Sequence, residues 1–190
     1  MKKVSGWFLR LLGWKINVDD KYRIDKAVVI MAPHTSMRDF WIGRLAFWYI
    51  QLPVKFLIKK EMFWFPMGVG LRLLGAVPVN RKRSGHVTEE IAQMFHEKTK
   101  FMFVITPEGT RNLNHHWKRG FYKIALMANV PVLLGYLDYA RKEGGIGGML
   151  VPTGNVEEDF KGIYDFYKNV TARYPEKFNL SPQHFNKVEK

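Results

Sequence analysis

Residues 27–40, AVVIMAPHTSMRDF, join a short apolar run to a polar turn and the start of a helical pattern. An apolar, β-branched run of this length, followed by a proline, is typical of a buried strand, here 27–32. Four further runs of the same kind follow, and segments with helical spacing separate them. The pattern predicts strands at 54–58, 76–79, 101–105 and 130–137, and helices at 40–51, 85–99, 121–128 and 157–172.

The alternation of strands and helices predicts an α/β fold. Because parallel strands need a crossover segment between them, we expect a single domain with a mixed, largely parallel central sheet flanked by helices. No internal repeat or low-complexity linker divides the 190 residues, so we place this domain at 19–173. An N-terminal amphipathic, interfacial helix is expected at 1–18, and a loosely held C-terminal tail at 174–190.

The charge of the chain predicts anionic partners. Thirty Lys and Arg residues against 17 Asp and Glu give a net charge of +13, which suits a nucleic acid, a phospholipid surface or a phosphorylated substrate. Aromatic residues make up 15%, a share that fits a membrane interface as well as it fits RNA. The absence of cysteine excludes disulfides, thiolate zinc sites and a cysteine nucleophile. No apolar run reaches the ~20 residues that a membrane-spanning helix needs, so we expect no transmembrane span.

The expected N-terminal helix carries an apolar stripe with basic neighbours. The stripe has helical spacing and consists of Val4, Trp7, Phe8, Leu11 and Leu12, with Lys2, Lys3, Arg10 and Lys15 among or beside them. A helix of this kind can lie in the headgroup layer of a membrane. It can equally dock on the protein's own core, and the sequence leaves both alternatives open.

Two residues of the turn after the first strand form a candidate catalytic pair. His34 falls at the end of that strand, and Asp39 lies five residues on, at or near the start of the next helix. If the turn folds Asp39 back onto one ring nitrogen of His34, the other nitrogen is free to remove a proton as a general base. The spacing also fits the alternative of a helix-capping Asp39 beside an incidental His34.

The segment TPEGTRN, residues 106–112, supplies a second group of candidates directly after the strand at 101–105. Its proline ends the strand, and its glycine permits a tight turn. The side chains of this turn are predicted to point into one cleft, where the donor fork of an arginine suits a phosphate. In isolation, each charged residue here also fits a solvated loop. The residues singled out are Glu108, Gly109, Thr110 and Arg111.

Three further basic residues stand near predicted strand or helix ends. Arg81 closes the segment GAVPVNR just past a short strand, and a surface arginine is the alternative there. Lys118 and Arg119 precede a predicted helix, whose N-terminus favours anions. The adjacent histidines at 115–116 could bind a metal, but the sequence offers no third ligand at a recognisable spacing, so no metal site is expected.

Taken together, these segments resemble the glycerolipid acyltransferase family. Four motifs occur in the family's order over roughly residues 25–140. The family's H-x4-D matches His34 and Asp39, its Gly-x-x-Phe-Ile-Asp-Arg matches GAVPVNR at Gly75 and Arg81, its Phe-Pro-Glu-Gly-Thr-Arg-Ser matches TPEGTRN at 107–111, and its Val-Pro-centred strand matches 130–131. The sequence departs from the family pattern at Pro33, Asn80 and Asn112, none of which is assigned chemistry.

The resemblance implies acyl transfer to a hydroxyl of a lysolipid, by default 1-acyl-glycerol-3-phosphate to give phosphatidate. Acyl-CoA or acyl carrier protein is the implied co-substrate, and neither a cofactor nor a metal is implied. In this reaction His34 is the general base and Asp39 orients it. The implied substrate-binding residues are Arg81, Glu108, Gly109, Thr110, Arg111, Lys118 and Arg119.

The same resemblance implies a peripheral or monotopic protein on an anionic phospholipid surface, at the cytoplasmic side of a bacterial inner membrane. One alternative is an acyltransferase of this family with a non-glycerol acceptor, such as an acylated amino acid lipid. A basic nucleic-acid-binding module would explain the charge, but no recognised motif is present and no nucleic acid partner is expected. A hydrolase built on Ser36, His34 and Asp39 is another alternative, and a non-catalytic membrane adaptor is the last.

Overall fold

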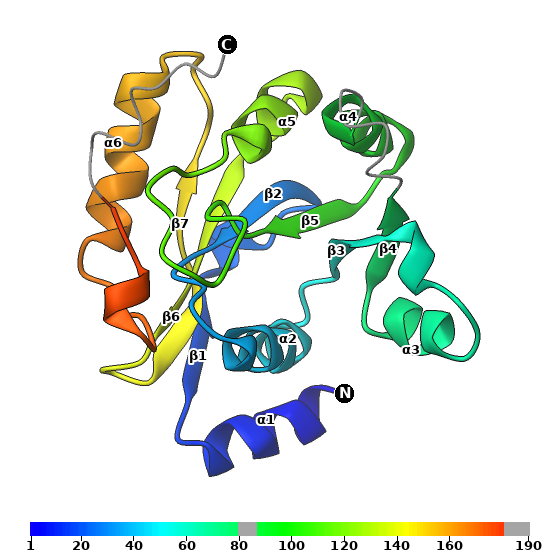
Figure 1. The fold of residues 1–190 in the computed structure, drawn as a ribbon, viewed down its shortest axis with the longest axis vertical. Helices are drawn as coiled ribbons and strands as arrows, with labels where there is room; N and C mark the ends of the chain where they lie inside the picture. Colours follow the sequence, from blue (N-terminus) through cyan, green and yellow to red (C-terminus); the bar gives the residue numbers. More distant parts are fainter. Residues whose placement is uncertain (80–86, 181–190) are drawn as a thin grey trace.

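A seven-stranded sheet lies at the centre of the computed structural model, which describes residues 1–79 and 87–180 (Figure 1). The strands lie in the order β1-β7-β6-β2-β5-β3-β4, and every neighbouring pair is parallel except β6 and β7. This arrangement confirms the predicted α/β fold with its mixed, largely parallel sheet. The strands are β1 Lys15–Val18, β2 Lys26–Met31, β3 Val54–Lys59, β4 Ala76–Val79, β5 Phe101–Ile105, β6 Val132–Asp138 and β7 Glu143–Leu150.

Helices cover both faces of the sheet. One apolar cluster joins the sheet to α4, α5 and α6, and a second joins it to α1 and α2 on the other face. The described α-helices are α1 Lys2–Leu11, α2 Met37–Ile50, α3 Met67–Leu73, α4 Val87–Glu97, α5 Gly120–Ala128 and α6 Val156–Tyr167. Short 3-10 turns lie at η1 Asp20–Tyr22, η2 Lys60–Met62 and η3 Pro175–Lys177.

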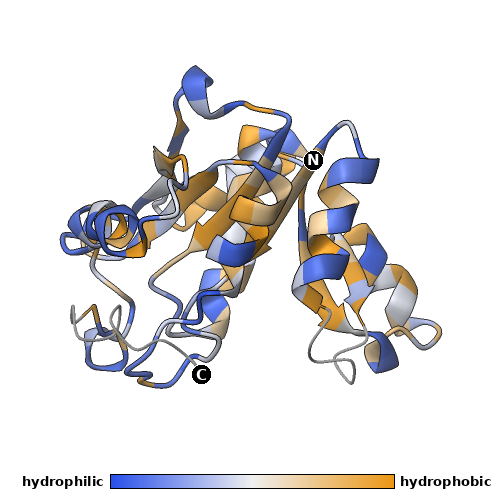
Figure 2. Ribbon diagram, turned by 90° about the horizontal axis from the view of Figure 1, so that it is seen from above, coloured by the Kyte–Doolittle hydropathy of each residue, from blue (hydrophilic) through white to orange (hydrophobic). Residues whose placement is uncertain are grey.

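The central strand β2 shows how the sequence divides between the two clusters. Val28 and Ile30 belong to the first cluster, whereas Ala27 and Val29 belong to the second, because successive strand residues face opposite sides of a sheet. All four side chains are fully buried. Figure 2 accordingly shows the strands as the most apolar part of the ribbon. A strand buried on both faces needs a continuous apolar run, which is what the sequence supplies.

The helix expected at 1–18 is too long. Helix α1 ends at Leu11, Gly13 turns the chain with a φ of 77°, and residues 15–18 form the edge strand β1. The physical reason is a change of period, since Ile16 is buried while its polar neighbours on both sides are exposed, as in a half-buried strand.

Helix α1 docks on α2 through a different face from its apolar stripe. Ser5, Gly6 and Leu9 are buried, and a Cβ placed on Gly6 would lie only 3.0 Å from the ring of Tyr49. The residues of the stripe stay exposed, Trp7 by 56%. Docking on the protein, one of the two alternatives left open by the sequence, therefore uses one face of α1. The exposed stripe, on which the membrane alternative rests, lies on another face of the same helix.

The loose tail expected at 174–190 is corrected as far as residue 180. The backbone N–H of Tyr174 donates to Oγ1 of Thr35 at 3.2 Å, and Phe178 and Leu180 pack against the first apolar cluster. Burial of these apolar side chains holds the segment against the domain. Residues 181–190 lie outside the described part of the chain.

Besides β1, the strand β7 and the helix α3 were not expected from the sequence. Strand β7 has the sequence EGGIGGML, and α3 has the sequence MGVGLRL. Glycine is disfavoured in both states, so neither segment carries a clear local signal.

Candidate active site

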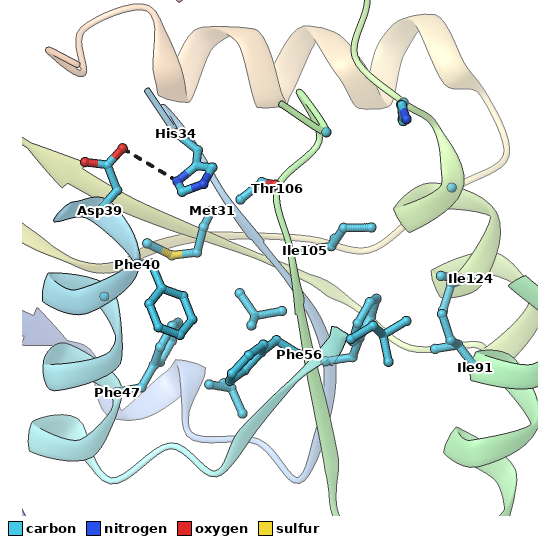
Figure 3. A pocket seen from close by; sticks show the side chains of 18 of the residues that line it. Met31, His34, Asp39, Phe40, Phe47, Phe56, Ile91, Ile105, Thr106 and Ile124 are labelled. Atoms are coloured by element: carbon cyan, nitrogen blue, oxygen red, sulfur yellow. Dashed lines mark ion pairs between the residues drawn. The ribbon is translucent and has the colours of Figure 1, made fainter. Parts of the chain in front are cut away.

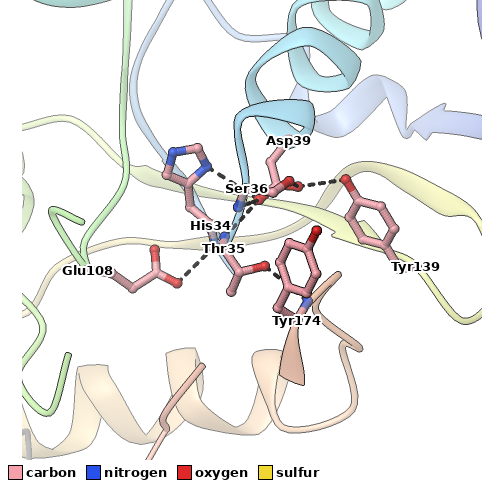
Figure 4. Close-up of polar contacts among 7 residues, drawn as sticks. All are labelled: His34, Thr35, Ser36, Asp39, Glu108, Tyr139 and Tyr174. Carbon is pink, nitrogen blue, oxygen red and sulfur yellow. Dashed lines mark hydrogen bonds and ion pairs between the residues drawn. The ribbon is translucent and has the colours of Figure 1, made fainter. Parts of the chain in front are cut away.

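The two candidate motifs meet at the carboxyl edge of the sheet. Strands β2 and β5 are parallel neighbours, with Ile30 opposite Ile105, so the turns that follow them lie side by side. The backbone N–H of His34 donates to Oε1 of Glu108 at 2.9 Å and joins the two turns directly (Figure 4). This edge is where open parallel sheets bind their ligands.

Asp39 is the third residue of α2 and ties the start of that helix to the turn before it. Its Oδ2 accepts hydrogen bonds from the backbone N–H groups of Thr35 at 2.7 Å and Ser36 at 2.8 Å. Its Oδ1 accepts from the Ser36 hydroxyl at 2.7 Å and from the Tyr139 hydroxyl at 2.6 Å. Four donors on two oxygens need the acceptor lone pairs of an ionised carboxylate.

His34 faces the same carboxylate. Its Nδ1 lies 3.6 Å from Oδ2 of Asp39, so the two groups are close but the predicted hydrogen bond is not formed at this distance. Burial lowers the pKa of His34 below its usual 6.5, the charge of Asp39 works against that shift, and the charge of Arg111 adds to it. A neutral imidazole is the form that can accept a proton. Asp39 therefore caps α2 and also lies beside His34, without the predicted hydrogen bond between the two side chains.

Glu108 is buried beneath the turn and does not face the cavity or the pocket described below. Its side chain is 5% exposed, and within the described chain its Oε2 has no hydrogen-bond partner. Burial raises the pKa of this carboxyl to about 8, although the hydrogen bond from the His34 backbone opposes the rise. The expectation that Glu108 points into the cleft is therefore wrong, because its side chain turns inward and holds the backbone of His34.

The raised pKa of Glu108 predicts a pH dependence of stability. The native state binds this proton more tightly than the unfolded chain does, so the stabilisation is full below the usual pKa of 4.5 and is lost as the pH rises through about 8. In Glu108→Gln the free energy of unfolding should fall less steeply over this window, by at most about 1.4 kcal/mol per pH unit. Denaturant titrations between these two pH values measure the free energy of unfolding, and a substitution of the exposed Glu90, Glu90→Gln, is the control. Parallel slopes for wild type and Glu108→Gln would contradict the assignment.

A cavity of about 680 Å³ opens beside His34. Figure 3 shows His34, Asp39 and Thr106 together in its upper part, Lys118 also belongs to its lining, and the remaining walls are mostly apolar. The apolar walls come from α2, β3, β5, α4 and α5, and their members include Phe40, Phe47, Phe56, Leu57, Ile91, Ile105 and Ile124.

The cavity exists because the sheet opens between β5 and β3. Only two residue pairs, Val54 with Met102 and Lys55 with Phe103, connect these strands. From Phe56 onward β3 pairs with β4 instead. The space left between the diverging strands is reached from both helical layers, which is why α2 and α4 line one cavity.

A second, smaller pocket of about 400 Å³ is lined by the turn at 35–37. Arg111 and Lys177 bring two cations to it, and Thr35, Ser36 and Thr110 bring hydroxyl groups. Arg111 and Thr110 therefore line this pocket and not the large cavity, so the single cleft expected for the TPEGTRN turn is divided in two. Met37, Asn112 and Tyr174 complete its lining.

The remaining predicted binding residues do not lie together in one site. Gly109 and Lys118 line the large cavity. Arg119 contributes to neither space, and its guanidinium lies 5.9 Å from the ring centre of Phe160. Arg81 lies outside the described residues.

Tyr139 is a site residue that the sequence reading missed. It directly follows β6, whose carboxyl end lies beside that of β2, and its hydroxyl donates to Oδ1 of Asp39. Burial and the hydrogen bond to Asp39 both raise the pKa of Tyr139 well above its usual value, so it remains a donor. The only signal in the sequence is its place at a strand end, and that becomes informative only once the order of strands is known.

Tyr139→Phe should lower kcat about tenfold with little change in KM. The substitution removes one charge-assisted hydrogen bond, and the carboxylate that faces His34 is then held by one element fewer. Steady-state kinetics of the variant measures the effect, and Tyr136→Phe, which lies in β6 with its ring against Phe166, is the control. Equal rates for both variants would exclude a role for Tyr139 in orienting Asp39.

Comparison with known proteins places the chain in a family. A family model described as Acyltransferase matches residues 15–133, so the chain belongs to the acyltransferase family and is an enzyme of that class. Among solved structures, it is similar to the 1-acyl-sn-glycerophosphate (LPA) acyltransferase PlsC from Thermotoga maritima, with a TM-score of 0.58 and 18% identity over 85% of this chain and 72% of that one. That likeness shows a shared fold. A search of curated protein sequences gave no significant match.

Proposed function

We propose that this acyltransferase moves a fatty acyl group from acyl-CoA or acyl carrier protein to a hydroxyl of a lysolipid, with 1-acyl-glycerol-3-phosphate as acceptor and phosphatidate as product. The observation that carries the proposal is the position of His34 and Asp39 at the polar end of a large, mostly apolar cavity. Such a cavity suits an acyl chain whose reactive end lies at the histidine.

The proposed reaction needs one general base. His34 takes the proton of the acceptor hydroxyl while the hydroxyl oxygen attacks the carbonyl carbon of the thioester. The carbon–sulfur bond then breaks, the electron pair leaves with the sulfur, and the proton passes from His34 to the thiolate. The products are an ester and a free thiol. Asp39 stabilises the imidazolium that forms between these two proton transfers.

The two spaces beside the turn suit two parts of the substrates. The apolar cavity suits the acyl chain, and the pocket with Arg111 and Lys177 suits the phosphate of the acceptor. Lys118, at the cavity's polar end, is placed for a second anionic group. In this assignment the acceptor approaches His34 from the side of the smaller pocket.

A membrane surface is the proposed location of the reaction, at the cytoplasmic side of the inner membrane. The net charge of +13 and the exposed stripe of α1 support contact with anionic phospholipid. In the part of the chain that the structure describes, no helix has the length and apolar content to cross a bilayer.

The proposal is tested by incubating the purified protein with a panel of lysolipids and acyl thioesters and identifying the products by mass spectrometry. Acylation of 1-acyl-glycerol-3-phosphate in preference to other lysolipids is expected. Preferential acylation of an acylated amino acid lipid would keep the reaction and replace the acceptor. Absence of any acylated product across the panel would contradict the proposal.

Arg111→Ala should raise the KM for the acceptor about ten- to a hundredfold and change the KM for the donor much less. A charge-assisted contact to phosphate is worth about 1.5–3 kcal/mol, which corresponds to a change of this size. Arg111→Lys should recover only part of the loss, because a point charge cannot replace a bidentate fork. The exposed Lys123→Ala on α5 serves as control. A rise confined to the donor's KM would assign Arg111 to the other substrate.

A further inference from the structure

Large apolar side chains gather on the surface between η2 and the end of α3. Phe65 is 84% exposed and Leu73 is 76% exposed. Other exposed members within the same 12 residues are Met62, Trp64, Met67 and Val69. We call residues 62–73 the α3 patch. A run of exposed apolar side chains of this density marks a contact surface rather than ordinary surface composition.

The α3 patch lies at the outer end of the sheet. Helix α3 joins β3 to the edge strand β4, and Figure 1 shows it at the edge of the molecule, beyond both strands. Strand β3 also carries Phe56 and Leu57, which line the large cavity. The patch is thus attached to the strand that forms one wall of the proposed acyl site.

We infer that the α3 patch is a membrane-contact surface that inserts its aromatic and aliphatic side chains between the headgroups of an anionic phospholipid bilayer. The choice of lipid as the occupant rests on the proposed function. The surface itself is distinct from the N-terminal helix, which packs on α2 and carries its own exposed stripe.

The composition around the patch fits lipid. Trp64 and Phe65 are the side-chain types that favour the interfacial layer. Exposed Lys60 and Arg72 flank them, and the guanidinium of Arg72 lies 5.9 Å from the ring centre of Phe63. Glu61 is the one acidic residue in the segment 59–73. Basic groups beside an inserted apolar surface add attraction to anionic headgroups.

A second contact surface also has a physical reason. The strength of an interfacial contact grows with the apolar area that it buries, so two contacts hold the protein on a membrane more firmly than one. Helix α1 and the α3 patch together supply two such contacts, and the second follows β3, the strand that forms one wall of the cavity.

The test is co-flotation of the full-length protein with vesicles of phosphatidylcholine mixed with phosphatidylglycerol, and of phosphatidylcholine alone. The double variant Trp64→Ser/Phe65→Ser should lower the partition coefficient on the mixed vesicles about tenfold to a hundredfold. A double variant of exposed apolar residues elsewhere, Leu126→Ser/Met127→Ser on α5, should bind as the wild type does. The variant Trp7→Ser/Phe8→Ser in α1 should reduce binding separately, and the two losses should add.

Unchanged vesicle binding in Trp64→Ser/Phe65→Ser would overturn the inference. So would light scattering that shows a wild-type dimer dissociated by this variant while vesicle binding persists, since the patch would then face a second copy. Because flotation does not depend on turnover, the inference and the proposed function fail separately. A protein that acylates nothing in the lysolipid panel but loses vesicle binding in the variant keeps its membrane surface.

Discussion

His34→Ala is expected to lower the rate of acyl transfer by a factor of about 10² to 10⁴ while the protein remains folded. His34 lines the cavity, and burial keeps its pKa below 6.5, so the imidazole is neutral and able to take a proton at physiological pH. Without it, the acceptor hydroxyl has no neighbouring base, because Asp39 is occupied by four donors and Glu108 is turned away. Single-turnover kinetics with saturating thioester measures the loss.

The control for this variant is His96→Ala, which changes an exposed histidine on α4. The rate of the wild type should also fall on acidification below the lowered pKa of His34, since protonation there removes the base. Thermal unfolding and far-UV spectra of both variants establish that they are folded. Wild-type turnover in folded His34→Ala would remove the central claim of the mechanism.

The sequence predicts the strands from β6 through β4 well, and it misses the margin formed by β1 and β7. Strands β2 and β5 are buried on both faces, so their apolar runs are continuous and mark them clearly. Strand β7 gives no such signal, because its glycines are present for close approach. A Cβ on Gly144 would lie 2.7 Å from Leu137, and Gly145 has a φ of 136°. Such requirements come from tertiary neighbours and leave no periodic pattern.

The candidate site also contains features that the sequence predicts and features that it does not. The closeness of His34 and Asp39 is predictable because it depends on one short turn between a strand and a helix. The directions of Glu108 and Arg111 are not predictable, since packing turns Glu108 into the interior and Arg111 into the smaller pocket, although both belong to one tight turn. Residue types alone show only that the turn carries chemistry.

Contacts between distant segments lie beyond local patterns altogether. Tyr139 is 100 residues from Asp39 along the chain, and it reaches the carboxylate only because β6 lies beside β2. Lys177 reaches the smaller pocket because the segment after α6 folds back along residue 35. Both residues follow from the order of strands and the course of the C-terminal segment, which the sequence does not reveal by periodicity or composition.

Asp39→Asn is expected to lower kcat by a factor of about 10² or more and also to destabilise the fold by about 1–3 kcal/mol. An amide has one acceptor oxygen, whereas Asp39 takes donors from Thr35, Ser36 and Tyr139 on both oxygens. The substitution therefore leaves donors unpaired at the start of α2. It also removes the negative charge that stabilises the imidazolium of His34.

A control variant at a similar carboxylate on α6 separates the loss of kcat from the loss of stability. Asp159 is 3% exposed and accepts hydrogen bonds from the Tyr122 hydroxyl at 2.6 Å and from the backbone N–H of Thr153 at 2.8 Å, an arrangement like that of Asp39 but in another helix. Asp159→Asn should therefore lower the free energy of unfolding by a similar amount and leave kcat nearly unchanged. Denaturant titrations and steady-state kinetics of both variants decide the matter. If Asp159→Asn lowers kcat as much as Asp39→Asn does, the role of Asp39 is limited to holding α2 in place. If only Asp39→Asn loses turnover, the carboxylate acts through His34 on the reaction itself.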